Sequence, residues 1–194
     1  MNLAIAETDW HTNPRAQAYL ELVRKWNRLY SLVSQRDISD LYRRHVENSL
    51  DLLPHMEHSS RHLDIGSGGG FPGIPLAIAR PSMKVVLNDR SQKKCRFLRQ
   101  VKLELGLENA EVFELNIEPC CSYGRRFDSV TARAVGPPEK AWSLGKQFLD
   151  RKGVVLLQTA NAIQQSDVPG GVMRASCSLR RGWVSVVARS RDAQ

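Results

Sequence analysis

Near the start of the chain, apolar residues recur at three- and four-residue steps, which is the pattern of an amphipathic helix. Arg24, Lys25 and Arg28 fall on the opposite face. A second helix is expected to begin at the capping pair Ser39-Asp40 and to end at Pro54. The predicted buried stripes are Tyr19, Leu22, Val23, Trp26, Leu29, Tyr30 and Val33 in the first helix, and Leu41, Tyr42, Val46, Leu50 and Leu53 in the second.

From Arg61 onward, short apolar runs alternate with helical stretches, which predicts a parallel sheet covered by helices. After Pro169-Gly170-Gly171, two further runs flank Arg180-Arg181-Gly182 and predict a closing hairpin. The fold class is therefore α/β, with a mostly parallel sheet in residues 59–194 as one compact unit and a helical extension in residues 1–58. The expected strands are 61–65, 84–88, 110–115, 127–132, 153–158, 172–178 and 183–188, and the expected helices of this part are 73–79, 91–105 and 137–150.

Composition indicates an ordinary globular protein, since 42% of the 194 residues are hydrophobic and 25% are charged. No apolar run reaches the roughly 18 residues of a membrane span, and the acidic N-terminus is unlike a signal peptide, so we expect a cytoplasmic protein. Cys95, Cys120, Cys121 and Cys177 form no C-x-x-C pair and are expected to be free thiols.

Charge adds a hypothesis about partners. The chain has 28 Lys and Arg against 20 Asp and Glu, which gives a net charge of +8. Such an excess favours a polyanionic partner, above all nucleic acid, although many proteins are mildly basic without one. In the expected helix 91–105, Arg96 and Arg99 lie opposite the apolar side, with Lys93 on the flank. This face is either a phosphate-binding surface or simply a solvated one.

The strongest local signal is the run HLDIGSGGGFPG, in which a strand leads directly into a glycine loop and then a helix. Glycines allow a sharp turn and close approach of a ligand, so we expect a small-ligand site at the carboxyl end of this strand. A dinucleotide site has the pattern G-x-G-x-x-G, but Phe71 stands where the third glycine would be. Asp64 precedes the loop and suits a cationic ligand such as S-adenosylmethionine. A dinucleotide site and a turn without a ligand remain the alternatives.

Further candidates follow from the ends of the other strands, because parallel strands deliver their carboxyl ends to one edge of the sheet. Asp89 ends the second strand, where a carboxylate can accept both ribose hydroxyl protons of a nucleoside. Ile117 and Glu118 follow the third strand and are expected beside an adenine, with a solvated loop acid as the alternative for Glu118. Arg133 ends the fourth strand, where it either pairs with an anionic ligand or forms a surface salt bridge. His55, His58 and His62 lack the further ligands of a metal site, and no metal is expected.

Four passages together resemble the glucose-inhibited division protein B family of small-subunit ribosomal RNA methyltransferases. They span about residues 20–160 in the order found in the family. The passages are Lys25-Trp26-Asn27-Arg28 with Arg44-His45, the loop LDIGSGGGFPGIPLAIARP, the run KKCRFLRQV, and FDSVTARA.

The resemblance implies a Rossmann-like S-adenosylmethionine-dependent methyltransferase that acts on nitrogen 7 of a guanine in 16S ribosomal RNA. Its partner would be that RNA or the small ribosomal subunit, and the enzyme is expected to be a monomer. By matched position, Gly66, Gly68 and Phe71 would line the donor site together with Asp64. Asp89 would meet the ribose, Ile117 and Glu118 the adenine, and Arg133 both donor and target as the catalytic residue.

The chain departs from the family pattern in three places. Gln158-Thr159 replaces a Lys-Gly pair after the fifth strand, Asn48 replaces an acid in the second helix, and the C-terminal third is short. Two other functions therefore stay open. One is a methyltransferase that acts on another RNA or a small molecule, and the other is a catalytically silent RNA-binding factor.

Overall fold

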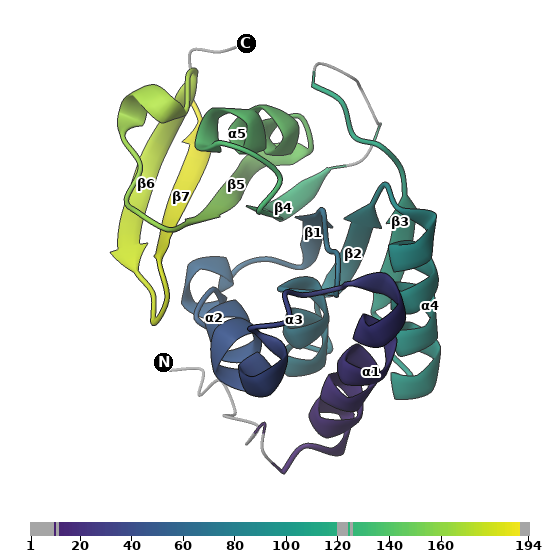
Figure 1. The fold of residues 1–194 in the computed structure, drawn as a ribbon. Helices are drawn as coiled ribbons and strands as arrows, with labels where there is room; N and C mark the ends of the chain where they lie inside the picture. Colours follow the sequence, from purple (N-terminus) through teal and green to yellow (C-terminus); the bar gives the residue numbers. More distant parts are fainter. Residues whose placement is uncertain (1–9, 11, 120–123, 125, 191–194) are drawn as a thin grey trace.

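The computed structural model describes residues 10, 12–119, 124 and 126–190. Its centre is a seven-stranded sheet with the order β3-β2-β1-β4-β5-β7-β6 (Figure 1). The strands β1 to β5 run parallel, while β7 is antiparallel to both of its neighbours. The strands are β1 (Arg61–Ile65), β2 (Lys84–Asp89), β3 (Ala110–Glu114), β4 (Phe127–Arg133), β5 (Leu149–Thr159), β6 (Gly171–Ser178) and β7 (Trp183–Arg189).

Alternation along the strands creates two separate apolar faces. Val85 and Leu87 on β2 pack into one hydrophobic cluster, whereas Val86 between them packs into the other. The first cluster lies under four helices and the second under α5, so the molecule has three layers (Figure 1). The α-helices are α1 (Pro14–Tyr30), α2 (Glu47–Leu50), α3 (Gly73–Ala79), α4 (Gln92–Leu105) and α5 (Pro138–Lys146).

The closing hairpin is confirmed, with β6 and β7 joined across residues 179–182. The strands β1 to β4 lie within a residue of their expected bounds, but β5 begins at Leu149 rather than at 153. Its first pairing, Leu149 with Phe127, is separated from the rest by a register irregularity between Phe127 and Ser129. The helix expected over 137–150 therefore ends at Lys146.

Helix α1 shows how local sequence sets its limits. The Asn13 side chain caps the start by accepting hydrogen bonds from the Arg15 and Ala16 amides, at 2.9 and 3.2 Å, and Pro14 opens the first turn. The helix ends where Ser31 adopts the left-handed conformation, so Val33 lies beyond it. Leu29 was wrongly expected on the buried face, because its side chain is 76% exposed.

The expected second helix is broken into pieces. Residues 38–40 form a 3₁₀ turn, Tyr42–Val46 a π-helical turn, Glu47–Leu50 one α-helical turn and Leu53–Met56 another 3₁₀ turn. The expected capping by Ser39-Asp40 is also wrong, because no side chain caps these segments. The apolar residues Leu41, Val46 and Leu53 are nevertheless buried in the first cluster, together with those of α1.

The helical segments before β1 therefore share one core with α3 and α4. The proposed boundary near residue 58 falls in the turn that precedes β1, where the Ser59 amide donates to the Met56 carbonyl. Of the cysteines, Cys95 and Cys177 are free, while Cys120 and Cys121 lie outside the described residues. No helix in the described part of the chain is long and apolar enough to cross a membrane.

Candidate functional site

The glycine loop connects β1 to α3 and is fixed by hydrogen bonds to the neighbouring strand. The Ser67 amide donates to the Asn88 carbonyl at 2.7 Å, and the Gly68 amide donates to Asp89 Oδ2 at 3.0 Å. Gly66 has a φ of +71°, and a Cβ there would lie 2.6 Å from Val135 Cγ1. Both facts favour glycine, because the backbone is left-handed here and Val135 occupies the position that a Cβ would take.

Beside this bend lies a cavity of about 300 Å³, here called the glycine-loop cavity. It is formed at the carboxyl ends of β1, β2 and β4 and by residues 115–117 after β3, as the parallel order of these strands dictates. Its lining residues are Ile65, Gly66, Asn88, Asp89, Arg90, Lys94, Leu115, Asn116, Ile117, Ala134, Val135, Lys140 and Leu144.

Three of the predicted site residues, Gly66, Asp89 and Ile117, line this cavity together. Asp89 is held in place, because Oδ1 accepts from the Ser91 amide at 2.8 Å and Lys94 Nζ lies 4.0 Å from Oδ2. A carboxylate oxygen has lone pairs to spare after these bonds, so Asp89 can still accept ligand hydroxyl groups. The combination of a fixed carboxylate, an apolar wall and a Cβ-free backbone fits a nucleoside.

Asp64 lies behind the loop rather than at the cavity. Its Oδ2 accepts from the Gly73 amide at 3.1 Å and its Oδ1 from the Thr131 hydroxyl at 2.9 Å, and only 1% of the residue is exposed. Burial raises the pKa of Asp64 to about 6, against the lowering effect of these hydrogen bonds and of Arg133. Asp64 thus joins the start of α3 to β4 beneath the site.

The buried His62 extends this network. Its Nε2 lies 3.0 Å from Thr131 Oγ1 and its Nδ1 lies 2.9 Å from Ser129 Oγ. Because the Thr131 hydroxyl donates its one proton to Asp64, it must accept from a protonated Nε2 of His62. Burial lowers the pKa of His62 to about 3, so the ring is neutral. This network has no sequence signal beyond the polar residues within otherwise apolar strands.

Phe71 also lies outside the glycine-loop cavity. Its ring packs against Tyr19, with centroids 5.2 Å apart, and against His45, with centroids 4.8 Å apart. The Arg133 guanidinium lies over the same ring, 6.0 Å from its centroid. Tyr19 in turn donates a 2.6 Å hydrogen bond to the Gly69 carbonyl. Phe71 therefore connects α1, the glycine loop and Arg133.

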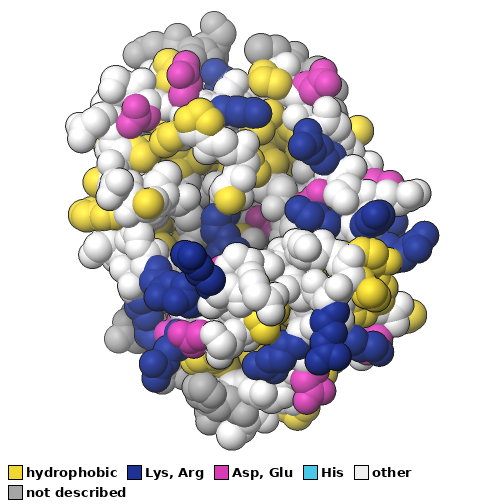
Figure 2. Space-filling model, in the orientation of Figure 1, with side chains coloured by type: hydrophobic (Ala, Val, Ile, Leu, Met, Phe, Trp, Pro, Cys, Tyr) yellow, Lys and Arg dark blue, Asp and Glu magenta, His cyan; other side chains and the backbone are white. Residues whose placement is uncertain are grey.

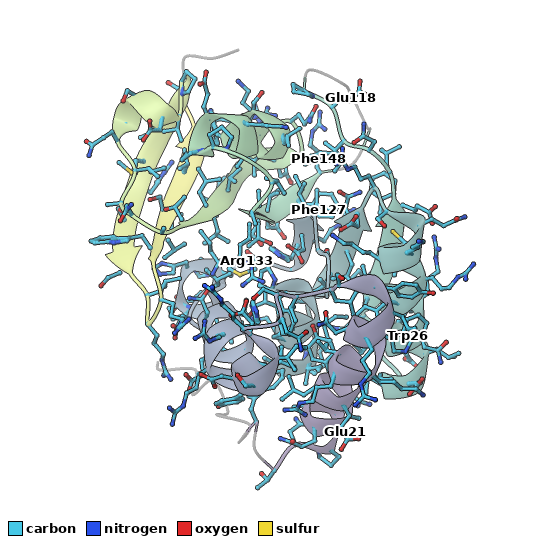
Figure 3. The ribbon with its side chains drawn as sticks, viewed as in Figure 1. Glu21, Trp26, Glu118, Phe127, Arg133 and Phe148 are labelled. Carbon is cyan, nitrogen blue, oxygen red and sulfur yellow. The ribbon has the colours of Figure 1, made fainter. Side chains whose placement is uncertain are left out.

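Arg133 stands at the centre of the molecule, between the helical segments and the sheet (Figure 3). Burial lowers the pKa of its guanidinium, partly offset by Asp64 and Tyr19. Among the described residues it forms neither a hydrogen bond nor an ion pair within 4.0 Å. Glu118 is exposed at the outer edge of the same view, far from Arg133. It is absent from the lining of the glycine-loop cavity, as is Gly68.

A second cavity of about 630 Å³, here called the hairpin cavity, adjoins the first, because Ala134 lines both. It lies at the carboxyl ends of β4 and β5 and reaches the turn between β6 and β7. Its lining residues are Asn48, Arg133, Ala134, Gly136, Pro138, Gln158, Thr159, Ala160, Asn161, Ala162, Ile163, Asp167 and Arg181.

Asn48 and Gln158, two positions that depart from the family pattern, are in direct contact in this cavity. The Gln158 side-chain amide donates to Asn48 Oδ1 at 2.7 Å and to the Asn48 carbonyl at 3.2 Å. The acid and lysine of the family pattern are thus replaced here by a neutral hydrogen-bonded pair. Sequence spacing did not show this contact, because the two residues are 110 positions apart.

Positive charge surrounds both cavities. Arg90, Lys94 and Lys140 line the glycine-loop cavity, and Arg133 and Arg181 line the hairpin cavity. Figure 2 shows Lys and Arg side chains around the hollowed centre of this face and over the helical part below it. In helix α4, Phe97, Leu98, Val101 and Leu105 are buried as predicted, but Arg99 pairs with Glu114 at 2.8 Å.

Comparison with known proteins decides the family. Residues 12–167 match the GidB family, described as rRNA small subunit methyltransferase G. This chain belongs to the GidB family. The proteins named ribosomal RNA small subunit methyltransferase G from Chromobacterium violaceum and from Neisseria meningitidis serogroup C (strain FAM18) are 48% identical over 118 residues and 43% identical over 134 residues. These alignments cover 61% and 69% of this chain, and only 56% and 62% of the two relatives.

Solved structures share the fold of this GidB family member. TrmN from Thermus thermophilus superposes with a TM-score of 0.57 at 20% identity, over 73% of this chain and 48% of that one. A mutant of MtNAS in complex with S-adenosylmethionine gives a TM-score of 0.62 at 16% identity, over 90% of this chain and 74% of that one. The fold is thus the Rossmann-like methyltransferase fold that the sequence predicts, with a helical N-terminal part.

The histidines considered for a metal do not come together. His62 is buried inside β1, whereas His55 and His58 line a different cavity below the amino-terminal ends of β4 and β5. No group of three or more His, Cys, Asp or Glu side chains suited to a metal ion occurs in the described ranges.

Proposed function

We propose that this GidB family member transfers a methyl group from S-adenosylmethionine to nitrogen 7 of a guanine in small-subunit ribosomal RNA. The observation that carries the proposal is the junction of two cavities at Ala134, one suited to a nucleoside and one lined by arginines. The names of the matched relatives support ribosomal RNA of the small subunit as the substrate. The basic rim of both cavities supports an RNA partner.

The glycine-loop cavity is the proposed donor site. Asp89 would accept the ribose hydroxyl protons, while Ile117 and Leu115 would pack against the adenine. Gly66 would let the backbone approach the ligand, and Lys140 is available for the donor's carboxylate. When bound, S-adenosylmethionine supplies a methyl group made electrophilic by its sulfonium. Asp64, Gly68 and Phe71 would act indirectly, because they hold the loop rather than line the cavity.

Arg133 would position the acceptor, because it lines the hairpin cavity and is followed directly by the residue shared by both cavities. Nitrogen 7 of guanine carries an in-plane lone pair and no proton, so attack on the methyl carbon needs no general base. The new C–N bond forms as the S–C bond breaks, and positive charge passes to the guanine ring. The contribution of the protein is then alignment of the three atoms in line.

The test is methylation of small ribosomal subunits by purified protein with labelled donor, followed by mass spectrometry of the RNA. We expect one added methyl on a guanine, and the same protein to act without a second copy. Transfer to another RNA alone would favour the alternative of a methyltransferase with a different substrate. The observation in favour of that alternative is the neutral Asn48–Gln158 pair in the hairpin cavity, which departs from the family pattern. Donor binding without transfer to any RNA would refute the proposal.

A further inference from the structure

The hairpin cavity holds several polar groups with unused hydrogen-bonding capacity. Arg181 is exposed and forms no ion pair with any described residue, and Arg133 is likewise unpaired. The Gln158 Oε1 atom is buried without a hydrogen-bond partner in the described part of the chain. The carboxylate of Asp167, in contrast, accepts from the Gln164 amide at 2.8 Å. A buried acceptor such as Gln158 Oε1 calls for a hydrogen-bond donor, whereas the guanidinium groups of Arg133 and Arg181 call for negative charge. The cavity therefore suits an occupant that carries both a donor group and an anionic group, as a nucleotide does.

The turn that carries Arg181 is held by two contacts. Asn48 Nδ2 donates to the Arg181 carbonyl at 2.8 Å, and Gln158 holds Asn48 from the other side. Gly182 has a φ of +77°, and a Cβ there would lie 2.3 Å from the Thr159 carbonyl oxygen. The turn is thus pressed against the end of β5. Its backbone cannot shift without breaking these contacts.

The two adjacent arginines of the turn are used differently. Arg180 Nη1 pairs with Glu47 at 2.9 Å and its Nε lies 3.5 Å from Asp51, so Arg180 attaches the hairpin to α2. Arg181 has a fixed backbone but a side chain without such a partner, and it lies on the cavity that contains Arg133. A guanidinium presented in this way is suited to bidentate binding of a phosphate.

We propose that the hairpin cavity receives the acceptor nucleotide and that Arg181 binds the phosphate of that nucleotide, with Asn48 and Gln158 as positioning residues for the turn. The inference rests on the proposed function and names a residue that binds the substrate of that function. Since Ala134 borders both cavities, a nucleotide anchored at Arg181 would have the donor site next to it.

The experiment compares Arg181→Ala with Arg174→Ala, which removes the same charge from an exposed position on β6 that lines neither cavity. Steady-state methylation of the RNA or subunit that the wild type modifies is measured over a series of KCl concentrations. For Arg181→Ala we expect KM for the RNA to rise about 10-fold, as for one lost charge-assisted contact. The slope of log KM against log salt should fall by about one, while kcat and donor affinity stay unchanged.

Arg174→Ala should keep the wild-type KM. Arg181→Lys should keep the salt slope and restore part of the KM, because it keeps the charge but not the planar fork. Asn48→Ala and Gln158→Ala should raise KM at constant kcat, since they release the turn. A wild-type KM and salt slope for Arg181→Ala would overturn this inference alone. A wild type that methylates no RNA would instead refute the proposed function, and this inference with it.

Discussion

Replacement of Asp64 by Asn tests whether a buried carboxylate ties the glycine loop to the sheet. Both oxygens of Asp64 accept hydrogen bonds, and burial raises its pKa to about 6 from the ordinary 3.8. A raised pKa means that the ionised form is less favourable in the folded state than in the unfolded chain. The stability that Asp64 contributes is therefore present below pH 3.8 and is lost as the pH rises toward 6.

The size of this effect follows from the two pKa values. Ionisation of Asp64 costs the folded state about 2 kcal/mol at pH 5 and about 3 kcal/mol at pH 8. Asp64→Asn removes this cost, while any change in hydrogen bonding is independent of pH. The free energy of unfolding of the variant, minus that of the wild type, should thus be about 1 kcal/mol larger at pH 8 than at pH 5.

Urea unfolding at pH 5 and pH 8 measures this difference, and groups that titrate equally in both proteins, such as His62, cancel. Asp128→Asn is the control. Partial burial raises the pKa of Asp128, but hydrogen bonds from Ser60 and Arg61 outweigh this and the net shift is downward. The pKa of Asp128 lies below 5 in both the folded and the unfolded state. The free energy of unfolding of Asp128→Asn, minus that of the wild type, should therefore be the same at pH 5 and pH 8. An equally constant difference for Asp64→Asn would refute the reasoning.

Three further predictions concern the loop and the site. Gly66→Val should abolish binding of S-adenosylmethionine in calorimetry, because even a Cβ meets Val135 at 2.6 Å; unchanged binding would contradict the donor site. Arg133→Ala should keep its thermal unfolding profile but lose methyl transfer, and full turnover would leave Arg133 a structural role. Tyr19→Phe should lose about 1–3 kcal/mol in urea unfolding, because the buried Gly69 carbonyl loses its donor. The matched Tyr30→Phe, at a half-buried tyrosine, should stay within about 0.5 kcal/mol of the wild type.

Features that depend on local pattern could be predicted from the sequence. The short apolar runs predicted the strands. Three residues of the glycine-loop cavity, Gly66, Asp89 and Ile117, were also predicted, because parallel strands bring their carboxyl ends to one edge of the sheet. The continuous helix over residues 39–53 was wrong because tertiary contacts override its apolar stripe. In this segment His45 packs on Phe71, Arg44 pairs with Asp37, and Asn48 reaches Arg181.

Site residues whose position depends on distant partners were beyond sequence reasoning. Phe71 belongs to the glycine loop in sequence, yet its ring turns into the core toward Tyr19, a residue of α1. Arg181 was identified only as part of a turn, since nothing local shows that this turn borders a cavity with Arg133. The hydrogen-bond network of His62, Thr131 and Asp64 depends on Thr131, which is more than 60 positions from the other two residues, so no local motif reveals it.

The bond from Asn48 to Arg181 spans 133 positions of the chain. During synthesis, the loop, the first four parallel strands and Arg133 emerge well before the turn at 179–182 exists. A nascent chain can therefore assemble the bend after Ile65 before the hairpin cavity exists, because that cavity also needs Arg181 from the later turn. The topology thus sets an order of assembly in which the glycine-loop cavity can form before β6 and β7 pair and complete the hairpin cavity.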